Sequence, residues 1–198
     1  MKIQFFYHVR KFLTASLDNS VKIWKLIHTP FNMTDDENQA AYRTELVNTL
    51  SNHHLGVNSI DVSPDGKIIA TRSLDSFIRF FSTDKENEQI RQLDCSPANS
   101  WTLEFFPCSK LLATGSMTGH IHIIRTESAE QACTLDSQLS FVSCIAISPQ
   151  GNKLAASSMD GKVVIFEIKV DENDQVTGQM KFNFEAHAQP VRALCFNV

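Results

Sequence analysis

The chain repeats itself with a period of 42 or 43 residues, and this feature constrains its fold more than any other. The clearest markers are prolines that follow similar apolar segments: Pro64, Pro107 and Pro149. They lie 43 and 42 residues apart. The same two spacings separate a second set of positions, each in a short turn that follows a serine: Asp75, Thr118 and Asp160. A period of this length with several short strands per repeat predicts an all-β fold of the β-propeller type.

Each repeat contains a characteristic first strand, expected over residues 57–62, 100–105, 142–147 and 191–196. Large apolar residues recur two positions apart in these segments, as Leu103 and Phe105 do, and a small residue directly precedes each pair: Ser59, Thr102, Cys144 and Ala193. A period of two indicates strands with distinct faces. The small residues suit an inner strand that is crowded near a central axis.

Three further strands are expected in each repeat. The second is a nearly continuous apolar run, typical of a strand covered on both faces, at 10–16, 67–73, 110–116 and 152–158. A tight turn then leads to third strands at 21–24, 78–81, 121–124 and 163–166. Weaker segments near 90–95, 131–136 and 180–184 are expected to form the outer edge.

The blade pattern resembles the WD-repeat β-propeller family, whose blades carry a His before the first strand, a Ser/Thr and an Asp at the second turn, and Trp-Asp after the third strand. The second blade matches with His53, Ser73 and Asp75, although Phe81-Ser82 replaces Trp-Asp. Other blades keep fewer members of the set: Asp18 and Trp24 in the first, Asp160 in the fourth, and His187 at the start of the fifth. The resemblance implies that these residues form a buried hydrogen-bond chain from the Asp through the His to the hydroxyl and the indole, which ties turns together across a blade.

The repeat boundaries divide the chain into parts of one partial propeller that spans residues 1–198. We expect an incomplete blade 1 over 1–50 with a polar insertion at 28–43, and complete blades over 53–95, 96–136 and 138–184. The last of these carries a polar insertion at 169–179, and 187–198 provides the first strand of blade 5. Both insertions are interpreted as surface loops. The resemblance implies seven blades, roughly 300 residues, so we expect the chain to be a fragment or a half-propeller.

Composition excludes several classes of function. Lys and Arg number 18 and Asp and Glu 22, which gives a formal charge of −4 and no basic footprint for nucleic acid or anionic lipid. No apolar stretch is long enough for a membrane span, and the N-terminus does not resemble a signal peptide. The five cysteines form no paired motif, which favours free thiols in a reducing compartment.

We find no catalytic constellation, cofactor motif or metal site in the sequence. His120 and His122 alternate on one strand as two metal ligands could, but a third ligand is missing, so we favour an exposed pair. Asp61 and Glu104 are interpreted as polar positions on inner strands. An enzyme, tested by a hydrolase activity that depends on Ser116 or His120, is the least favoured class.

Protein recognition is therefore the favoured function, with the site at the start of the inner strands. The positions that vary most there include Asn58, Trp101 and Arg192, and the resemblance implies that they line the top face of the propeller. Trp and Arg are enriched at interaction hot spots. The alternative is that Trp101 fills the space between two blades. Weaker candidates flank the second turns: Phe77, Leu74, Met117 and Met159.

Within the family, several segments resemble the WD-repeat subunits shared by the superkiller (Ski) complex and the RNA polymerase-associated factor complex. These segments are 53–57, 73–79, 101–107, 112–115 and 187–192. The resemblance implies a non-catalytic scaffold in exosome-linked 3′-to-5′ mRNA decay and transcription elongation, found in nucleus and cytoplasm. Its partners would be the helical-repeat scaffold of the Ski complex and elongation-complex subunits, without direct nucleic-acid or membrane binding. The alternative is a WD-repeat adaptor in another assembly, such as a ubiquitin ligase.

Overall fold

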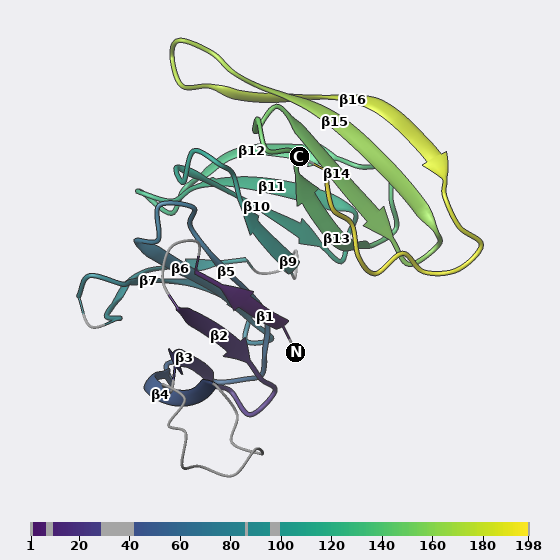
Figure 1. The fold of residues 1–198 in the computed structure, drawn as a ribbon. Coiled ribbons are helices and arrows are strands. Elements are labelled where there is room, and N and C mark those ends of the chain that lie inside the picture. The colour runs from purple at the N-terminus through teal and green to yellow at the C-terminus, as the bar shows by residue number, and fades with distance from the viewer. Residues whose placement is uncertain (1, 7–9, 29–41, 86, 96–99, 198) are drawn as a thin grey trace.

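The computed structural model describes residues 2–6, 10–28, 42–85, 87–95 and 100–197. Their strands form four four-stranded antiparallel sheets, arranged side by side as the blades of an arc (Figure 1). Within every sheet the strands pair in chain order, so that each blade is a simple meander. The all-β, partial-propeller prediction is confirmed. None of the described residues forms a helix long and apolar enough to cross a membrane.

The strands follow the repeat predicted from the sequence. Blade 1 contains β1 (Lys2–Phe5), β2 (Lys11–Ala15), β3 (Val21–His28) and β4 (Tyr42–Leu50). Blade 2 contains β5 (Val57–Val62), β6 (Ile68–Ser73), β7 (Phe77–Ser82) and β8 (Gln89–Asp94). Blade 3 contains β9 (Ser100–Phe105), β10 (Leu111–Ser116), β11 (His120–Arg125) and β12 (Gln131–Asp136). Blade 4 contains β13 (Val142–Ile147), β14 (Lys153–Ser158), β15 (Lys162–Val170) and β16 (Val176–Glu185).

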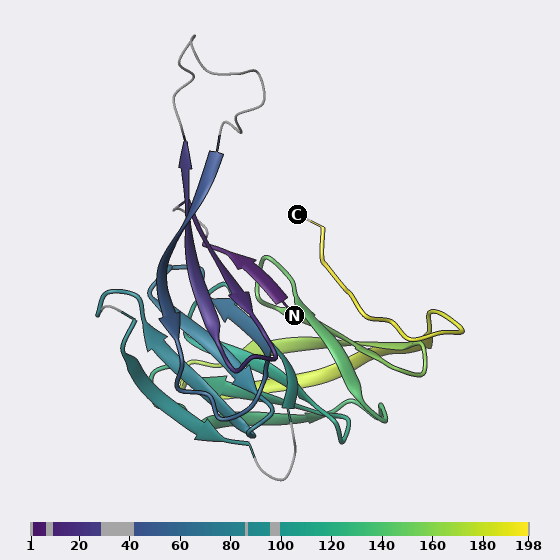
Figure 2. The ribbon, with the colours of Figure 1, turned by 90° about the horizontal axis from the view of Figure 1, so that it is seen from below.

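The first strand of each blade is the innermost one. Strand β1 lies beside β5, β5 beside β9 and β9 beside β13, so these strands line the concave side of the arc. Figure 2 shows β1 and the segment after β16 on that concave side. The small residues that precede the large apolar pairs, such as Ser59 on β5, allow this close approach.

Apolar side chains fill the three spaces between neighbouring blades. Blade 2 shows how one strand serves two of them: Phe81 packs in the cluster shared with blade 1, and the adjacent Phe80 packs in the cluster shared with blade 3. Both side chains are fully buried. The largest cluster lies between blades 3 and 4 and includes Ile123 and Phe166. Because successive strand residues point to opposite faces, the nearly continuous apolar runs supply both interfaces of a blade.

Blade 1 is a complete sheet, which corrects the prediction of an incomplete blade over 1–50. Strand β1 pairs antiparallel with β2, and Phe5 lies opposite Phe12 with ring centroids 5.7 Å apart. Four residues are too few to show the column pattern of the other inner strands, so this strand depends on the neighbour with which it pairs. Of the insertion predicted at 28–43, residues 29–41 lie outside the described residues, and the remainder belongs to β3 and β4.

Two other boundaries differ from the prediction. The polar stretch 169–179 mostly extends β15 and β16 into a long hairpin, because Ile168 and Val176 anchor it in the core and Val170 pairs with Val176. Residues 187–197 do not form the predicted first strand of a fifth blade. An inner strand is held by the second strand of its own sheet, and no such partner lies among the described residues.

Candidate functional site

The pairing register brings a defined set of loops to one end of the arc. Inner strands start where second strands end, as the pairs Val57 with Ser73 and Val142 with Ser158 show. The turns between the second and third strands, residues 16–20, 73–77, 116–120 and 158–162, therefore lie at the same end. Outer strands finish there as well, since Asp94 pairs with Phe77. We call this end the top face.

Three of the four predicted recognition residues line one groove. The groove has a volume of about 470 Å³, runs along the inner strands, and includes Asn58, Trp101 and Arg192 among its lining residues. Trp101 is 38% exposed, and its ring stands edge-on to that of Phe141 with centroids 5.5 Å apart. The indole therefore rests on a neighbouring aromatic ring while part of its surface stays accessible. This arrangement allows a partner to bury the remaining surface.

Asn58 is held by intramolecular bonds at both ends of its amide. Its Nδ2 donates to the carbonyl oxygen of Trp101 at 3.2 Å, and its Oδ1 accepts from Nη1 of Arg72 at 3.4 Å. Arg72 is only 2% exposed. The amide thus connects a buried guanidinium to the backbone of Trp101. Asn58 positions the indole in addition to lining the groove.

Arg192 reaches the groove from the segment that follows β16. The carbonyl oxygen of Val191 accepts hydrogen bonds from Ser143 Oγ at 2.6 Å and Ser157 Oγ at 3.0 Å. These bonds fix the backbone next to Arg192, whose side chain is exposed. Phe77, the fourth predicted residue, does not line this groove; its ring lies 5.2 Å from the guanidinium carbon of Arg79.

The two carboxylates on the inner strands bind backbone groups of the next blade. Oδ2 of Asp61 accepts from the N–H of Phe105 at 2.7 Å. One blade further on, Oε1 of Glu104 accepts from the N–H of Ile147 at 3.1 Å. The two contacts are the same interaction repeated around the arc. They account for these carboxylates as links between blades rather than as an acid/base pair.

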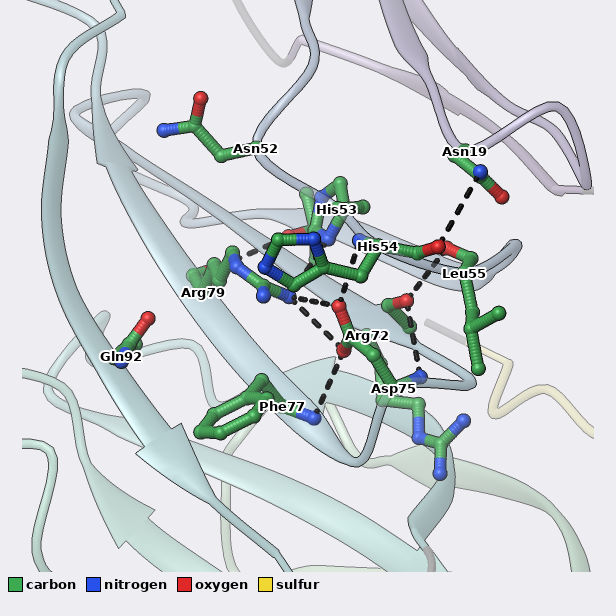
Figure 3. Close-up of polar contacts among 12 residues, drawn as sticks. Asn19, Asn52, His53, His54, Leu55, Arg72, Asp75, Phe77, Arg79 and Gln92 are labelled. Atoms are coloured by element: carbon green, nitrogen blue, oxygen red, sulfur yellow. Dashed lines mark hydrogen bonds and ion pairs between the residues drawn. The ribbon is translucent and has the colours of Figure 1, made fainter.

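A buried polar network lies at the top of blade 2, and Figure 3 shows its members. Arg79, 3% exposed, forms an ion pair with Asp75 at 2.9 Å and donates to Nδ1 of His53 at 3.0 Å. Because a guanidinium only donates, Nδ1 must accept, and the ring proton is then on Nε2. Asp75 also accepts from the backbone N–H groups of His54 and Phe77, at 3.0 and 3.1 Å.

This network differs from the predicted one. The expected route ran from Asp75 through His53 to a hydroxyl, but Arg79 lies between the Asp and the His. Ser73 Oγ instead donates to the carbonyl oxygen of Leu55 at 2.7 Å. His53 stands edge-on to Phe81 with centroids 6.1 Å apart. The absence of an indole at position 81 thus leaves a ring contact in place of a hydrogen bond.

The environment of blade 2 shifts two pKa values. Burial and the nearby Arg79 charge lower the pKa of His53 from 6.5 to about 4. Burial alone would raise the pKa of Asp75, but hydrogen bonds from Arg79, His54 and Phe77 outweigh it and hold this pKa at about 2. Near neutral pH the network therefore contains a neutral imidazole, a carboxylate and a guanidinium.

The remaining predicted network residues act locally. Asp18 accepts from the N–H and hydroxyl of Ser20. Trp24 Nε1 donates to Thr14 Oγ1 at 3.0 Å within its own blade. Asp160 accepts from the N–H of Lys162 at 3.3 Å, so it also shapes a turn. These contacts connect no two blades.

His187 is exposed, and within the described residues only its backbone N–H is seen to bond, to the Gly161 carbonyl oxygen at 3.1 Å. His120 and His122 stack with centroids 6.3 Å apart, but both are half-buried rather than exposed as predicted. The described part of the chain contains no group of three or more His, Cys, Asp or Glu side chains placed to hold a metal ion.

Comparison with known proteins agrees with this architecture. The family model described as "WD domain, G-beta repeat" matches residues 44–82, and the one described as "Vps42 beta-propeller" matches residues 102–193. The WD repeat-containing protein SL1-17 of Schistosoma mansoni is 33% identical over 186 residues, which cover 93% of this chain and 54% of that protein. The WD repeat-containing protein VIP3 of Arabidopsis thaliana is 32% identical over 199 residues, with 93% and 55% covered.

A solved chain from "Crystal Structure of Mitotic Checkpoint Complex" superposes with a TM-score of 0.74 at 17% identity, over 98% of this chain and 54% of that chain. This likeness concerns the fold alone. Together with the sequence matches and the four-bladed arc, it identifies the chain as a member of the WD-repeat β-propeller family. Such propellers generally act as non-catalytic interaction scaffolds. The chain spans about half the length of the curated relatives it matches.

Proposed function

We propose that the protein is a non-catalytic scaffold that binds partner proteins through the inner-strand groove of its top face. The observation that carries this proposal is the half-exposed Trp101, which rests on Phe141 and has its backbone fixed by Asn58. A rigid aromatic side chain beside a groove loses little conformational entropy when a partner covers it, and Trp is enriched among hot-spot residues. Arg192, exposed on the same groove, adds a cationic group for orientation.

We further propose that the partners are those of the WD-repeat subunits shared by the Ski and polymerase-associated factor complexes. The support is the resemblance of segments 53–57, 101–107 and 187–192 to those subunits. The second of these contains Trp101 and the third contains Arg192. The proposal implies a helical-repeat partner in cytoplasmic mRNA decay, elongation-complex partners in the nucleus, and presence of the protein in both compartments.

Trp101→Ala tests the groove directly. We expect the variant to reduce capture of partner proteins at least tenfold, since truncation of a hot-spot Trp costs about 2 kcal/mol or more. Tyr42→Ala, which removes a similarly exposed aromatic side chain from the outer strand of blade 1, is the matched control. Both variants and the unmodified chain would be immobilised and their captured proteins quantified by mass spectrometry.

Capture that is unchanged by Trp101→Ala would refute the groove as the binding site. Capture of ubiquitin-ligase subunits, with neither decay nor elongation factors, would refute the proposed partners while leaving a scaffold role intact.

A further inference from the structure

One apolar side chain projects from the same turn in every blade. The turns share the pattern of a serine, an apolar residue and then Asp or Thr, and their apolar residues are Leu17, Leu74, Met117 and Met159. These side chains are 69%, 42%, 46% and 44% exposed. Tight turns normally carry polar or small residues. Four exposed, flexible apolar residues at equivalent turns therefore form a patterned surface, which we call the tip row.

A repeated hydrogen bond gives the four turns a common geometry. In each, the serine hydroxyl oxygen accepts from the backbone N–H of the residue after the tip, at 3.2 Å in blades 1 to 3 and 3.5 Å in blade 4. The serine side chain is thereby turned to the backbone, and the residue between the two bonded groups remains outside. Since all four turns lie at the top face, each tip stands at that end of its own blade.

Carboxylates lie at the same end of blades 2 to 4 as the tip row. Exposed acidic side chains stand at the ends of the outer strands and in the last turn: Asp94, Asp136, Asp160 and Glu185. Of the described residues at this end of these blades, the accessible cationic side chains are Lys162 and Arg192. Lys162 already lies 3.8 Å from Asp160. Arg79 is buried and engaged by Asp75. The apolar tips thus stand in an acidic setting.

We propose that the tip row binds a partner segment in which apolar residues alternate with Lys or Arg. This inference rests on the proposed scaffold function and specifies the partner's chemistry. The tips would bury their apolar area against the partner's apolar residues. The flanking carboxylates would pair with its cations and disfavour acidic segments. Leucine and methionine adapt to differently shaped partners, so the row suits more than one such segment.

The test uses the 198-residue chain and two short fluorescein-labelled peptides. One alternates Leu with Lys, and the other has Glu in place of every Lys. We expect the Lys peptide to bind at least tenfold more tightly by fluorescence polarisation and to weaken as salt is raised. The double variant Met117→Ser/Met159→Ser should weaken binding of the Lys peptide about tenfold. Val47→Ser/Val170→Ser, which removes similarly exposed side chains outside the tip row, should leave it within about twofold.

Equal affinity for both peptides, no measurable binding, or the same loss in the two double variants would overturn the proposal. The scaffold proposal fails separately, through Trp101→Ala. If Trp101→Ala abolishes partner capture and Met117→Ser/Met159→Ser changes neither capture nor peptide affinity, the tip row is wrong and the groove stands. If Met117→Ser/Met159→Ser weakens both partner capture and peptide affinity while Trp101→Ala changes neither quantity, partners bind to the tip row alone.

Discussion

The buried imidazole of blade 2 makes folding stability depend on pH in a way that can be calculated. His53 is 5% exposed and accepts a hydrogen bond from Arg79, so the folded protein holds it neutral down to a pKa of about 4. In the unfolded chain its pKa is about 6.5. Above pH 6.5 the ring is neutral in both states. As the pH falls below 6.5, the unfolded chain gains a proton that the folded protein does not, so the folded state loses stability until about pH 4.

Between pH 7 and pH 5 this single group should lower the free energy of unfolding by about 2 kcal/mol, at about 1.4 kcal/mol for each pH unit below 6.5. Asp75, with a pKa of about 2, stays ionised throughout this interval. The perturbation that isolates the effect is His53→Gln, which keeps an acceptor for Arg79 and removes the titrating group. His54→Gln, at the adjacent exposed position, is the matched control.

The assay is urea unfolding of the three proteins at both pH values, followed by tryptophan fluorescence. The unmodified chain and His54→Gln should lose about 2 kcal/mol more than His53→Gln on going from pH 7 to pH 5. The histidines other than His53 and His54 are present in all three proteins, so their contributions cancel in this comparison. If His53→Gln lost as much stability as the unmodified chain, the imidazole would not be held neutral by burial and Arg79, and the account of the network would be wrong.

Two further predictions concern contacts between blades and turn geometry. Asp61→Ala should reduce the free energy of urea unfolding by about 1.5–3 kcal/mol, because it leaves the N–H of Phe105 buried without its charged acceptor; an unchanged midpoint would contradict the carboxylate link. Gly119→Ala should cost more than about 3 kcal/mol, since a Cβ there would lie 1.8 Å from the Leu139 carbonyl oxygen, while Gly66→Ala, also at positive φ but with open space, should cost roughly 1–2 kcal/mol. Equal thermal shifts in the two glycine variants would show that backbone strain alone, not the collision, sets the cost.

The sequence pattern predicts the blades because equivalent strands are buried in the same way in each of them. An inner strand must place large apolar residues two positions apart, and a second strand covered on both faces must be nearly all apolar, so the pattern recurs at a fixed period. The inner strands of blades 2 to 4 have the predicted bounds 57–62, 100–105 and 142–147. Strand β1 and the long hairpin of blade 4 were missed because pairing with a neighbour, rather than an internal pattern, makes them strands.

The candidate groove was partly predictable for the same reason. Equivalent positions in a repeat occupy equivalent places, so Asn58, Trp101 and Arg192 could be grouped before any coordinates were known, and they line one groove. Phe77 lies outside this groove because it belongs to a different column, at the start of a third strand. The exposed tips at Leu74, Met117 and Met159 were visible as flanking residues, but their common exposure required the structure.

The network of blade 2 shows why side-chain roles within a repeat are harder to derive than the repeat itself. Arg79 occupies the third strand, where the neighbouring positions are apolar, and nothing in its spacing marks it as a partner of both Asp75 and His53. A buried guanidinium needs a carboxylate and further acceptors to remain charged, and the turn aspartate and the loop histidine are the acceptors that the fold places within 3.0 Å. Phe81, which stands where the family motif has Trp, offers His53 a ring contact and no hydrogen-bond donor. Blade 2 thus keeps the His, Ser and Asp of the family motif. The hydrogen bonds of the His and the Asp, however, run to Arg79, a residue that the motif does not contain.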